Sequence, residues 1–316
     1  MQNASSYTDA QRTHDPLKRQ TVYDIVTKTI TELLEQDIVP WQDPIITRTL
    51  NKNRNLISDR PYSGMNALIT MAAQLRYGYT ASHWMTLNQA KTIGAELKEN
   101  EQKNGTPIIF YNFTKKLTKN EVTGETEEES KAFARFFTIY NVEQFSNIPK
   151  VIEISQSKQS NNQGNPFEAI DRAQAVIDNM KNRPSIVIQG NSAYYMPRRD
   201  LINMPKPTSF RSPEAYYATF FHELIHSTGS ESRLKRKEVT DPILFGSHNY
   251  SKEELTAELG AAFLCAHSNI FDSTKVNNAA YIKTWLRTLK NDPKMLVQAA
   301  AKAQKAADYI LNRSEK

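Results

Sequence analysis

Apolar side chains recur at helical spacing soon after a polar, unpatterned start. Residues 1–20 show no such repeat, and we expect them to be disordered. From Thr21 to Asp37 the apolar positions return every three or four residues, which predicts an amphipathic helix. The same spacing predicts a helix over 66–76 and another that begins near Thr86. Short helices therefore open the ordered part of the chain.

Two segments rich in β-branched and aromatic residues follow these helices. Residues 107–113 and 132–142 have the composition that is typical of strands. The stretch between them is polar and carries Thr123-Gly124, which suits a reversal of the chain. We therefore predict a long β-hairpin that completes a small α+β unit.

A polar linker separates this unit from the rest of the chain. Residues 155–165 contain no apolar side chain, and we place the linker at 154–165. A helix is expected from Pro166 to Met180, and the chain is mostly helical from Pro213 onward. The sequence thus predicts an α+β fold with two domains, the first over 21–153 and the second, mainly helical with a small sheet, over 166–316. The short strands of that sheet are predicted at 185–188, 193–196 and 200–204.

Composition narrows the class of protein. A chain of 316 residues with 39% hydrophobic residues can build two domains, each with its own core. Its single cysteine excludes an intramolecular disulfide framework and a cysteine-rich zinc module. The first thirty residues lack the apolar run of a secretory signal, and no apolar stretch approaches the length of a membrane span. We expect a soluble, cytoplasmic protein without a membrane partner.

Positive charge is concentrated in one segment. The whole chain carries a net charge of +6, but between Arg48 and Lys119 there are 11 basic residues and only 4 acidic ones. Aromatic residues are interleaved with these cations. Exposed rings among cations are typical of single-strand binders, because bases stack on rings while phosphates meet Lys and Arg. Composition alone favours the plainer interpretation, in which most of these rings lie in a core and the cations form a solvated face.

The second domain contains an H-E-x-x-H motif at residues 222–226. Its surroundings predict a helix, since Ser212 fits an N-cap, Pro213 fits the first turn and Gly229 fits the position after the last turn. The motif therefore lies inside a helix of about four turns.

On such a helix the two histidines of the motif share one face. His222 and His226 are four residues apart, so both imidazoles can reach one tetrahedral metal ion. Glu223 lies about 100° around the helix, where it could take a proton from the attacking water. The sequence therefore predicts a zinc site, with His222 and His226 as ligands and Glu223 as the catalytic base.

A catalytic zinc ion needs a third protein ligand, and residues 253–262 offer one on a second helix. Glu254 and Glu258 are four residues apart, which suits one carboxylate on the metal and the next as an acceptor for a ligand histidine. Ser251-x-x-Glu254 also fits a capping box, which would engage Glu254 locally and leave Glu258 as the ligand. We take Glu254 as the third ligand and Glu258 as the alternative.

The chemistry expected of this site is metal-assisted hydrolysis of a peptide bond. Strand 193–196 or strand 200–204 could offer the edge on which a peptide substrate adds as a further strand. Two other interpretations remain, a structural metal in a protein that only binds DNA, and a nuclease. The nuclease is disfavoured because nucleases usually use carboxylate-rich sites for hard cations.

Short motifs in both halves resemble those of one family. The chain is similar, over nearly all of its length after about residue 20, to the ArdC-type antirestriction proteins, which are related to the TraC primases of conjugative plasmids. The motifs that carry the resemblance in the first half are 60–66, Trp84, 89–91, 105–107 and 140–144, and in the second half Tyr194-Tyr195, Pro197, Asp200, Met204-Pro205, 222–229 and 253–264.

The resemblance implies an amino-terminal domain that binds single-stranded DNA without sequence preference and a zincin-like, gluzincin-type metallopeptidase domain. It implies protection of the DNA of a mobile element inside a bacterial host cell, and it supports Zn2+ as the cofactor and Glu254 as the third ligand. The protein substrate of the peptidase is not identified by the sequence. The candidate DNA-binding residues are Trp41, Arg60, Tyr62, Asn66, Trp84, Lys91 and Lys103.

Overall fold

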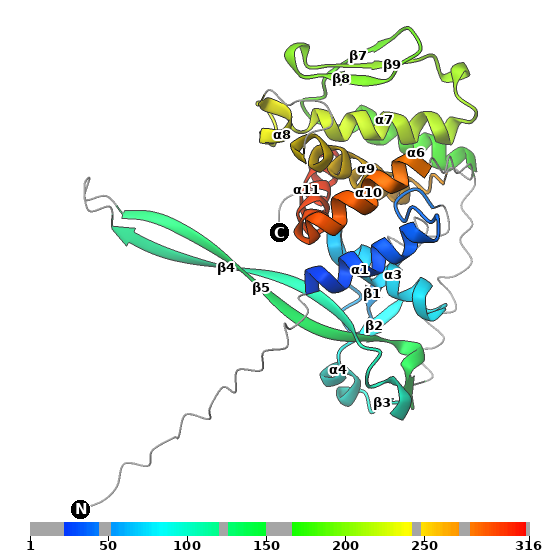
Figure 1. Cartoon of the computed structure of the whole chain (residues 1–316), viewed down its shortest axis with the longest axis vertical. Coiled ribbons are helices and arrows are strands. Elements are labelled where there is room, and N and C mark those ends of the chain that lie inside the picture. The colour runs from blue at the N-terminus through cyan, green and yellow to red at the C-terminus, as the bar shows by residue number, and fades with distance from the viewer. Residues whose placement is uncertain are drawn as a thin grey trace, which may run out of the picture.

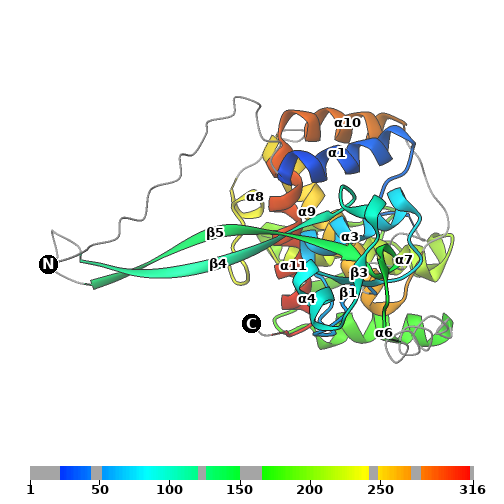
Figure 2. The same cartoon turned by 90° about the horizontal axis from the view of Figure 1, so that it is seen from below.

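A computed structural model describes residues 22–43, 52–119, 126–149, 166–241, 248–271 and 279–313. These residues form an elongated body from which a two-stranded arm projects to one side (Figures 1 and 2). The expected disordered start, the hairpin tip and the linker at 154–165 lie outside the described ranges, so these three assignments and the domain boundaries stay predictions.

The amino-terminal half packs helices against a four-stranded sheet of order β1-β2-β5-β4. A helix expected at 66–76 is present as α3, and it ends at Gly78, whose φ of 72° is left-handed. The helix expected near Thr86 is α4, which begins with a capping box between Thr86 and Gln89. The elements of this half are α1 (Val22–Glu35), β1 (Arg54–Asn55), α3 (Gly64–Tyr77), β2 (His83–Met85), α4 (Leu87–Thr92), β3 (Glu96–Leu97), β4 (Thr106–Lys119), β5 (Thr126–Asn141) and β6 (Phe145–Ser146).

Strands β4 and β5 form the predicted hairpin, which is longer than the sequence pattern indicated. They pair antiparallel from Thr106 opposite Ile139 to Lys119 opposite Thr126. At the root of this pair Ile108, Ile109 and Ile139 are buried in the body. Beyond them both strands leave the body as the arm (Figure 1).

The carboxy-terminal half is mainly helical with a small sheet, as expected. Its three strands have the order β7-β9-β8, with β7 parallel and β8 antiparallel to the central strand β9. The sheet lies across helix α7 at one end of the molecule (Figure 1). The elements are α6 (Pro166–Asn179), β7 (Ser185–Ile188), β8 (Tyr194–Met196), β9 (Leu201–Met204), α7 (Pro213–Ser227), α8 (Lys237–Thr240), α9 (His248–Ser268), α10 (Ala279–Asn291) and α11 (Pro293–Ile310).

One hydrophobic cluster runs through both halves, and a smaller one around Met85 and Tyr140 lies within the amino-terminal half. Helix α1 joins α11 through the Thr27 hydroxyl, which donates to the Pro293 carbonyl at 2.9 Å. Helix α3 joins the same helix through the Gly64 amide, which donates to Gln304 Oε1 at 2.8 Å. Small side chains let the backbone of α11 approach its neighbours, and those buried along it are Ala299, Ala300, Ala303, Ala306 and Ala307.

None of the helices in the described residues combines the length and the apolar character that crossing a membrane requires.

Candidate metal centre

Helix α7 carries the H-E-x-x-H motif and begins where the sequence predicts. Ser212 caps it, since its side-chain oxygen accepts the Ala215 amide at 3.1 Å, and Pro213 occupies the first turn. Most residues in the last three turns of α7 are buried, but His222 and His226 are half-buried, so both project from the face that solvent reaches. Local capping and periodicity therefore position both histidines.

Gly229 follows the helix as predicted, but for a different reason. Its φ is not left-handed, so it does not serve as a left-handed stop. A Cβ at this position would lie 2.4 Å from Val239 Cγ2 and 3.0 Å from Arg236 Nη2. Glycine is thus required because the segment around Arg236 and Val239 approaches the end of α7 closely.

Glu254 on α9 converges with the two histidines. The two Nε2 atoms of His222 and His226 are 3.1 Å apart. Glu254 Oε2 lies 3.6 Å from His222 Nε2, and Glu254 Oε1 lies 3.6 Å from His226 Nε2. Within the described ranges these residues make the one group of three or more His, Cys, Asp or Glu side chains with the geometry to hold a metal ion.

The competing interpretation of Glu254 as part of a capping box is wrong. Helix α9 already begins at His248, so Ser251 lies within the helix and is not its N-cap. Glu254 consequently sits in the second turn, where its side chain faces α7 across the interface between the two helices.

Glu253, which the sequence interpretation did not single out, supports His226 from behind. Its Oε1 lies 3.1 Å from His226 Nδ1. Arg236 holds this carboxylate, since its Nε donates to Oε2 at 2.9 Å and its Nη2 donates to Oε1 at 2.6 Å. Burial alone would raise the pKa of Glu253, but the hydrogen bonds from His226 and Arg236 outweigh it and lower the pKa. A carboxylate that stays ionised here orients the imidazole and leaves Nε2 free to bind a metal.

Glu258 has a different role from the one expected. It is not part of the three-residue group, and its carboxylate accepts a hydrogen bond from Gln42 Nε2 at 3.3 Å. The carboxylate next to the imidazole of His226 is Glu253 instead. Gln42 follows α1, so the amino-terminal half borders the candidate metal centre.

Neighbouring charges change the pKa values of His222 and Tyr250. Burial disfavours protonation of His222, but the neighbouring carboxylates outweigh it, Glu254 above all, and raise its pKa to about 9. Burial and then Glu254 raise the pKa of Tyr250 to about 12, and its hydroxyl is hydrogen-bonded to Glu254. Glu223, whose charge acts on both groups, is itself buried. The sequence interpretation missed Tyr250, although its position four residues before Glu254 places both on one helix face.

Strand β8 is the sheet edge next to this helix pair. Of the two strands expected to offer an edge, 193–196 lies at the edge and 200–204 lies in the centre. The Tyr195 hydroxyl of β8 donates to Asp200 Oδ1 at 2.9 Å, and Arg233 donates to both oxygens of Asp200 at 2.7 and 2.8 Å. Arg233 Nη1 also donates to the Ser227 carbonyl at the end of α7, at 3.1 Å. This network fixes the edge strand relative to the H-E-x-x-H helix.

All three aromatic residues among the candidate DNA-binding residues are buried. Trp84 is fully buried, and its indole N–H donates to Asn53 Oδ1 at 3.0 Å. Trp41 packs edge-on against Trp285, with ring centroids 6.0 Å apart, and Tyr62 is also buried. A buried ring presents no face to a base, so the expectation of base stacking is wrong for all three. These three rings are part of the hydrophobic core.

The remaining candidates divide between structure and surface. Asn66 binds the edge of β4, since its Nδ2 donates to the Ile109 carbonyl at 2.7 Å and its Oδ1 accepts the Ile109 amide at 2.9 Å. Arg60, Lys91 and Lys103 are exposed and stay candidates for phosphate contacts. Among the side chains that the structure describes in the amino-terminal half, the exposed rings lie elsewhere, at Tyr77, Phe110, Phe136 and Phe137.

Comparison with known proteins gives matches for both halves. Residues 20–142 match the N-terminal domain of the anti-restriction factor ArdC, and residues 171–302 match a zincin-like metallopeptidase domain. DNA primase TraC of Escherichia coli is 29% identical over 330 residues, which cover 100% of this chain and 22% of the primase. The chain thus spans about a fifth of that relative. An uncharacterized protein of Sinorhizobium fredii, y4eC, is 30% identical over 300 residues, covering 92% of this chain and 91% of that protein.

Solved structures show the same arrangement. The metal-free crystal structure of the antirestriction protein ArdC from the R388 plasmid has a TM-score of 0.67 and 28% identity, and covers 93% of this chain and 99% of that one. Its Mn(II)-bound structure has a TM-score of 0.68 and 27% identity, and covers 92% and 97% of the two chains. The order of the two matched domains, the shared fold and the full-length relative together show that this chain belongs to the family of ArdC-type antirestriction proteins.

Proposed function

We propose that this chain binds single-stranded DNA of a mobile element and hydrolyses a peptide bond at a zinc ion held by His222, His226 and Glu254. The observation that carries the peptidase proposal is the convergence of these three side chains from two helices, with Glu223 beside them. The Mn(II)-bound ArdC structure supports a divalent metal in this fold. Two imidazoles and one carboxylate are a donor set that suits zinc.

The distances between the candidate donor atoms are close to those of a tetrahedral site. Bond lengths of about 2.0–2.2 Å place the ligand atoms of a tetrahedral site about 3.3–3.6 Å apart. The two Nε2 atoms are 3.1 Å apart, and each lies 3.6 Å from a different oxygen of Glu254. One ligand atom from each residue lies within 4.8 Å of the other two. A metal ion would therefore need an adjustment of the side chains, mainly a rotation of the Glu254 carboxylate that brings one oxygen close to both imidazoles.

Side-chain exposure supports a catalytic rather than a closed structural site. Structural zinc sites are usually enclosed by four protein ligands, whereas catalytic sites keep one position open. Three protein ligands converge here, and the side chains of His222 and Glu254 remain 21% and 27% exposed. This geometry leaves room for water and for a scissile carbonyl.

The protein groups around the site suit peptide hydrolysis. A bound zinc ion would polarise the carbonyl and lower the pKa of the attacking water. Glu223 is buried next to His222 and would accept the proton from that water and pass it to the leaving amine. Tyr250, like an ordinary tyrosine, keeps its proton at neutral pH, and its surroundings raise its pKa further, to about 12. Its hydroxyl is therefore a candidate donor to the oxygen that becomes negative. Strand β8 offers unpaired backbone groups on which an extended substrate would align.

The conservative variant Glu223→Gln tests the peptidase proposal. It removes the base but no ligand, so metal content should equal that of the wild type while cleavage of casein, or of the chain itself, is lost. Retention of full cleavage by this variant would show that Glu223 is not the base. If the zinc-loaded wild type cleaves neither substrate while chelation lowers its melting temperature, the alternative applies, a DNA-binding antirestriction protein with a structural metal.

DNA binding is proposed for the amino-terminal half. Its support is the match to the N-terminal domain of ArdC and the charge of the segment from Arg48 to Lys119, where 11 basic residues face 4 acidic ones. Binding to a single-stranded oligonucleotide should weaken steeply as salt rises, because neutralised phosphates release counterions. Equal and weak binding of single strand and duplex at low salt would contradict this proposal.

A further inference from the structure

Three phenylalanines are exposed where the β4–β5 arm leaves the body, and two of them are in contact. Phe110, Phe136 and Phe137 are 46%, 48% and 43% exposed. Phe110 and Phe137 meet edge to face, with ring centroids 5.6 Å apart. The register pairs Phe137 with Ile108 and Phe136 with Ile109, so Phe110 and Phe137 share one face of the arm and Phe136 points to the other. Exposed rings in contact mark an interaction surface more often than a chance feature. We call Phe110 and Phe137 the arm-root rings.

The register of the arm separates its charges into two zones. The half of the arm near the body, residues 106–114 and 131–141, contains Lys131 and Arg135 and no acidic residue. The described outer half, residues 115–119 and 126–130, contains three lysines and three glutamates, with Lys116 opposite Glu129. The arm-root rings therefore lie in the basic, acid-free zone.

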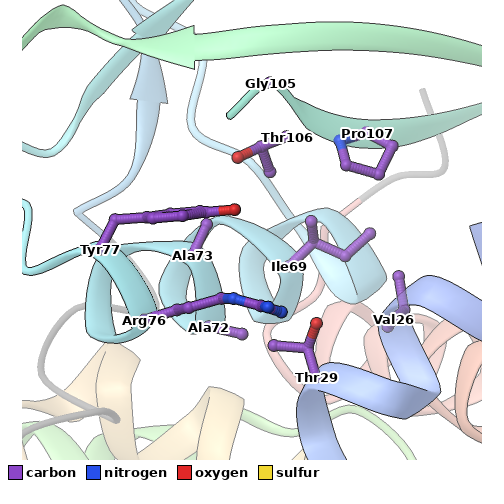
Figure 3. A pocket seen from close by; sticks show the side chains of 10 residues that line it. All are labelled: Val26, Thr29, Ile69, Ala72, Ala73, Arg76, Tyr77, Gly105, Thr106 and Pro107. Atoms are coloured by element: carbon purple, nitrogen blue, oxygen red, sulfur yellow. The ribbon is translucent and has the colours of Figure 1, made fainter. Parts of the chain in front are cut away.

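A fourth exposed ring stands at the root of the same arm. Tyr77, 40% exposed at the end of α3, lines a cavity of about 70 Å³ together with Thr106 and Pro107 of β4 (Figure 3). The Arg76 guanidinium carbon lies 5.8 Å from the centroid of the Tyr77 ring. Thr106 and Phe110 share a face of β4, because side chains alternate along a strand. The cavity has room for a few water molecules but not for a base, so bases would meet the ring surfaces themselves.

We propose that the arm-root rings, with Tyr77, are the surface on which this protein stacks the bases of single-stranded DNA. The inference rests on the DNA binding proposed above and names its site. Exposed rings stack on unpaired bases, whereas the bases of a duplex are already stacked on one another. The near half of the arm carries cations and no acidic residue, which suits the phosphates of such a strand, while Arg76 beside Tyr77 is paired with Glu32 at 3.3 Å. The surface differs from the set the sequence suggested, in which Trp41, Tyr62 and Trp84 are buried.

The test uses the full chain and a fluorescein-labelled (dT)20 oligonucleotide, followed by anisotropy at several salt concentrations. The double variant Phe110→Ala/Phe137→Ala should bind about 10- to 100-fold more weakly than the wild type. The salt dependence of its binding should stay close to that of the wild type, because rings and not charges have been removed. Ile57→Ala and Ile188→Ala remove apolar side chains of similar exposure elsewhere, and both should bind like the wild type.

A tryptophan probe reports stacking directly. All three native tryptophans, Trp41, Trp84 and Trp285, are buried. The variant Phe110→Trp should therefore gain emission that (dT)20 quenches in a saturable manner, while the wild-type emission changes little.

Several outcomes separate this inference from the proposal on which it rests. If the wild type does not bind (dT)20, DNA binding itself fails. If the wild type binds and the double alanine variant, with an unchanged melting temperature, binds equally well, the assignment of the surface is wrong. It is also wrong if a duplex competes as well as the single strand, or if sedimentation shows a wild-type dimer that the double variant cannot form, since the rings would then serve self-association.

Discussion

Glu253 lies behind His226, with its Oε1 3.1 Å from the imidazole Nδ1, while its Oε2 accepts a hydrogen bond from Arg236 at 2.9 Å. Arg236 also binds the end of α7, since its Nη2 donates to the Ile225 carbonyl at 2.8 Å. The side chains of Glu253 and Arg236 are each 6% exposed, and that of His226 is 14% exposed. The orientation of the candidate ligand His226 thus depends on a charged pair that joins the two metal-site helices.

Replacement of Glu253 by glutamine should weaken metal binding. The amide cannot carry the charge that fixes the tautomer of His226, so we expect about 10- to 100-fold lower zinc affinity in competition with a fluorescent chelator. Glu258→Gln is the matched control, since Glu258 lies outside the three-residue group, and its effect should be much smaller. An equal loss in both variants would show that net charge matters and orientation does not.

Gly260→Ala should destabilise the protein, although alanine is the better helix former. A Cβ at Gly260 of α9 would lie 2.6 Å from Ile225 Cδ1 and 2.8 Å from Ile225 Cγ1. Overpacking of this kind costs about 1–3 kcal/mol, which exceeds the helix gain of about 1 kcal/mol. Because Ile225 lies within the H-E-x-x-H motif, zinc affinity should fall too. Urea unfolding measures the loss of stability. Partial recovery of the unfolding free energy in the double variant Gly260→Ala/Ile225→Val would show that the clash is with Ile225. A Gly260→Ala variant that is as stable as the wild type, or more stable, would refute the clash.

Asp200→Asn should loosen the sheet edge. Arg233, whose side chain is 1% exposed, would lose its counter-charge, and β8 would lose its anchor to the end of α7. Breaking a buried pair costs about 3–5 kcal/mol, and since Asp200 is 43% exposed we expect a smaller loss of about 1–3 kcal/mol in chemical denaturation. Asp178→Asn breaks a surface pair with Arg183 and should change stability little. Equal stability of the two variants would contradict the anchoring role.

Acid should destabilise the metal-free protein partly through His83. Burial, and then the charge of Arg54, lower the pKa of this histidine from its ordinary value of 6.5. Below about pH 6.5 the unfolded chain therefore binds a proton that the folded chain refuses, so stability falls as pH falls through this window. The drop in melting temperature between pH 7.5 and pH 5.5 should be smaller for His83→Gln than for the wild type. An identical drop in both would exclude His83 as a contributor.

Local patterns were sufficient for much of the candidate site. The positions of His222 and His226 on one helix face follow from a spacing of four residues, and Ser212 and Pro213 mark the start of that helix. The hairpin and the short strands follow from composition and alternation over a few residues. Each of these features depends on residues that are close to one another in the sequence, which is why the sequence alone predicts them.

Aromatic residues show where sequence reasoning ended. Trp84 and Phe110 both lie in the basic segment, but one is fully buried and the other is 46% exposed. Nothing in their local sequence separates them, since burial depends on which elements pack against each ring. The hydrophobic cluster that both halves share is a second example. The polar linker indicates two domains, but α1 and α3 of the amino-terminal half pack on α11 of the carboxy-terminal half.

The sequence by itself determined the H-E-x-x-H helix, the acidic partner helix and the strands, because hydrogen bonds and side-chain periodicity within each element are local. Only the tertiary structure decided that Glu254 faces the histidines, that Glu253 and not Glu258 supports His226, and that Phe110, Phe136 and Phe137 stay outside the core. These choices depend on how each helix or strand is rotated against neighbours distant in the chain. That rotation is set by the packing of whole faces, which no short stretch of sequence records.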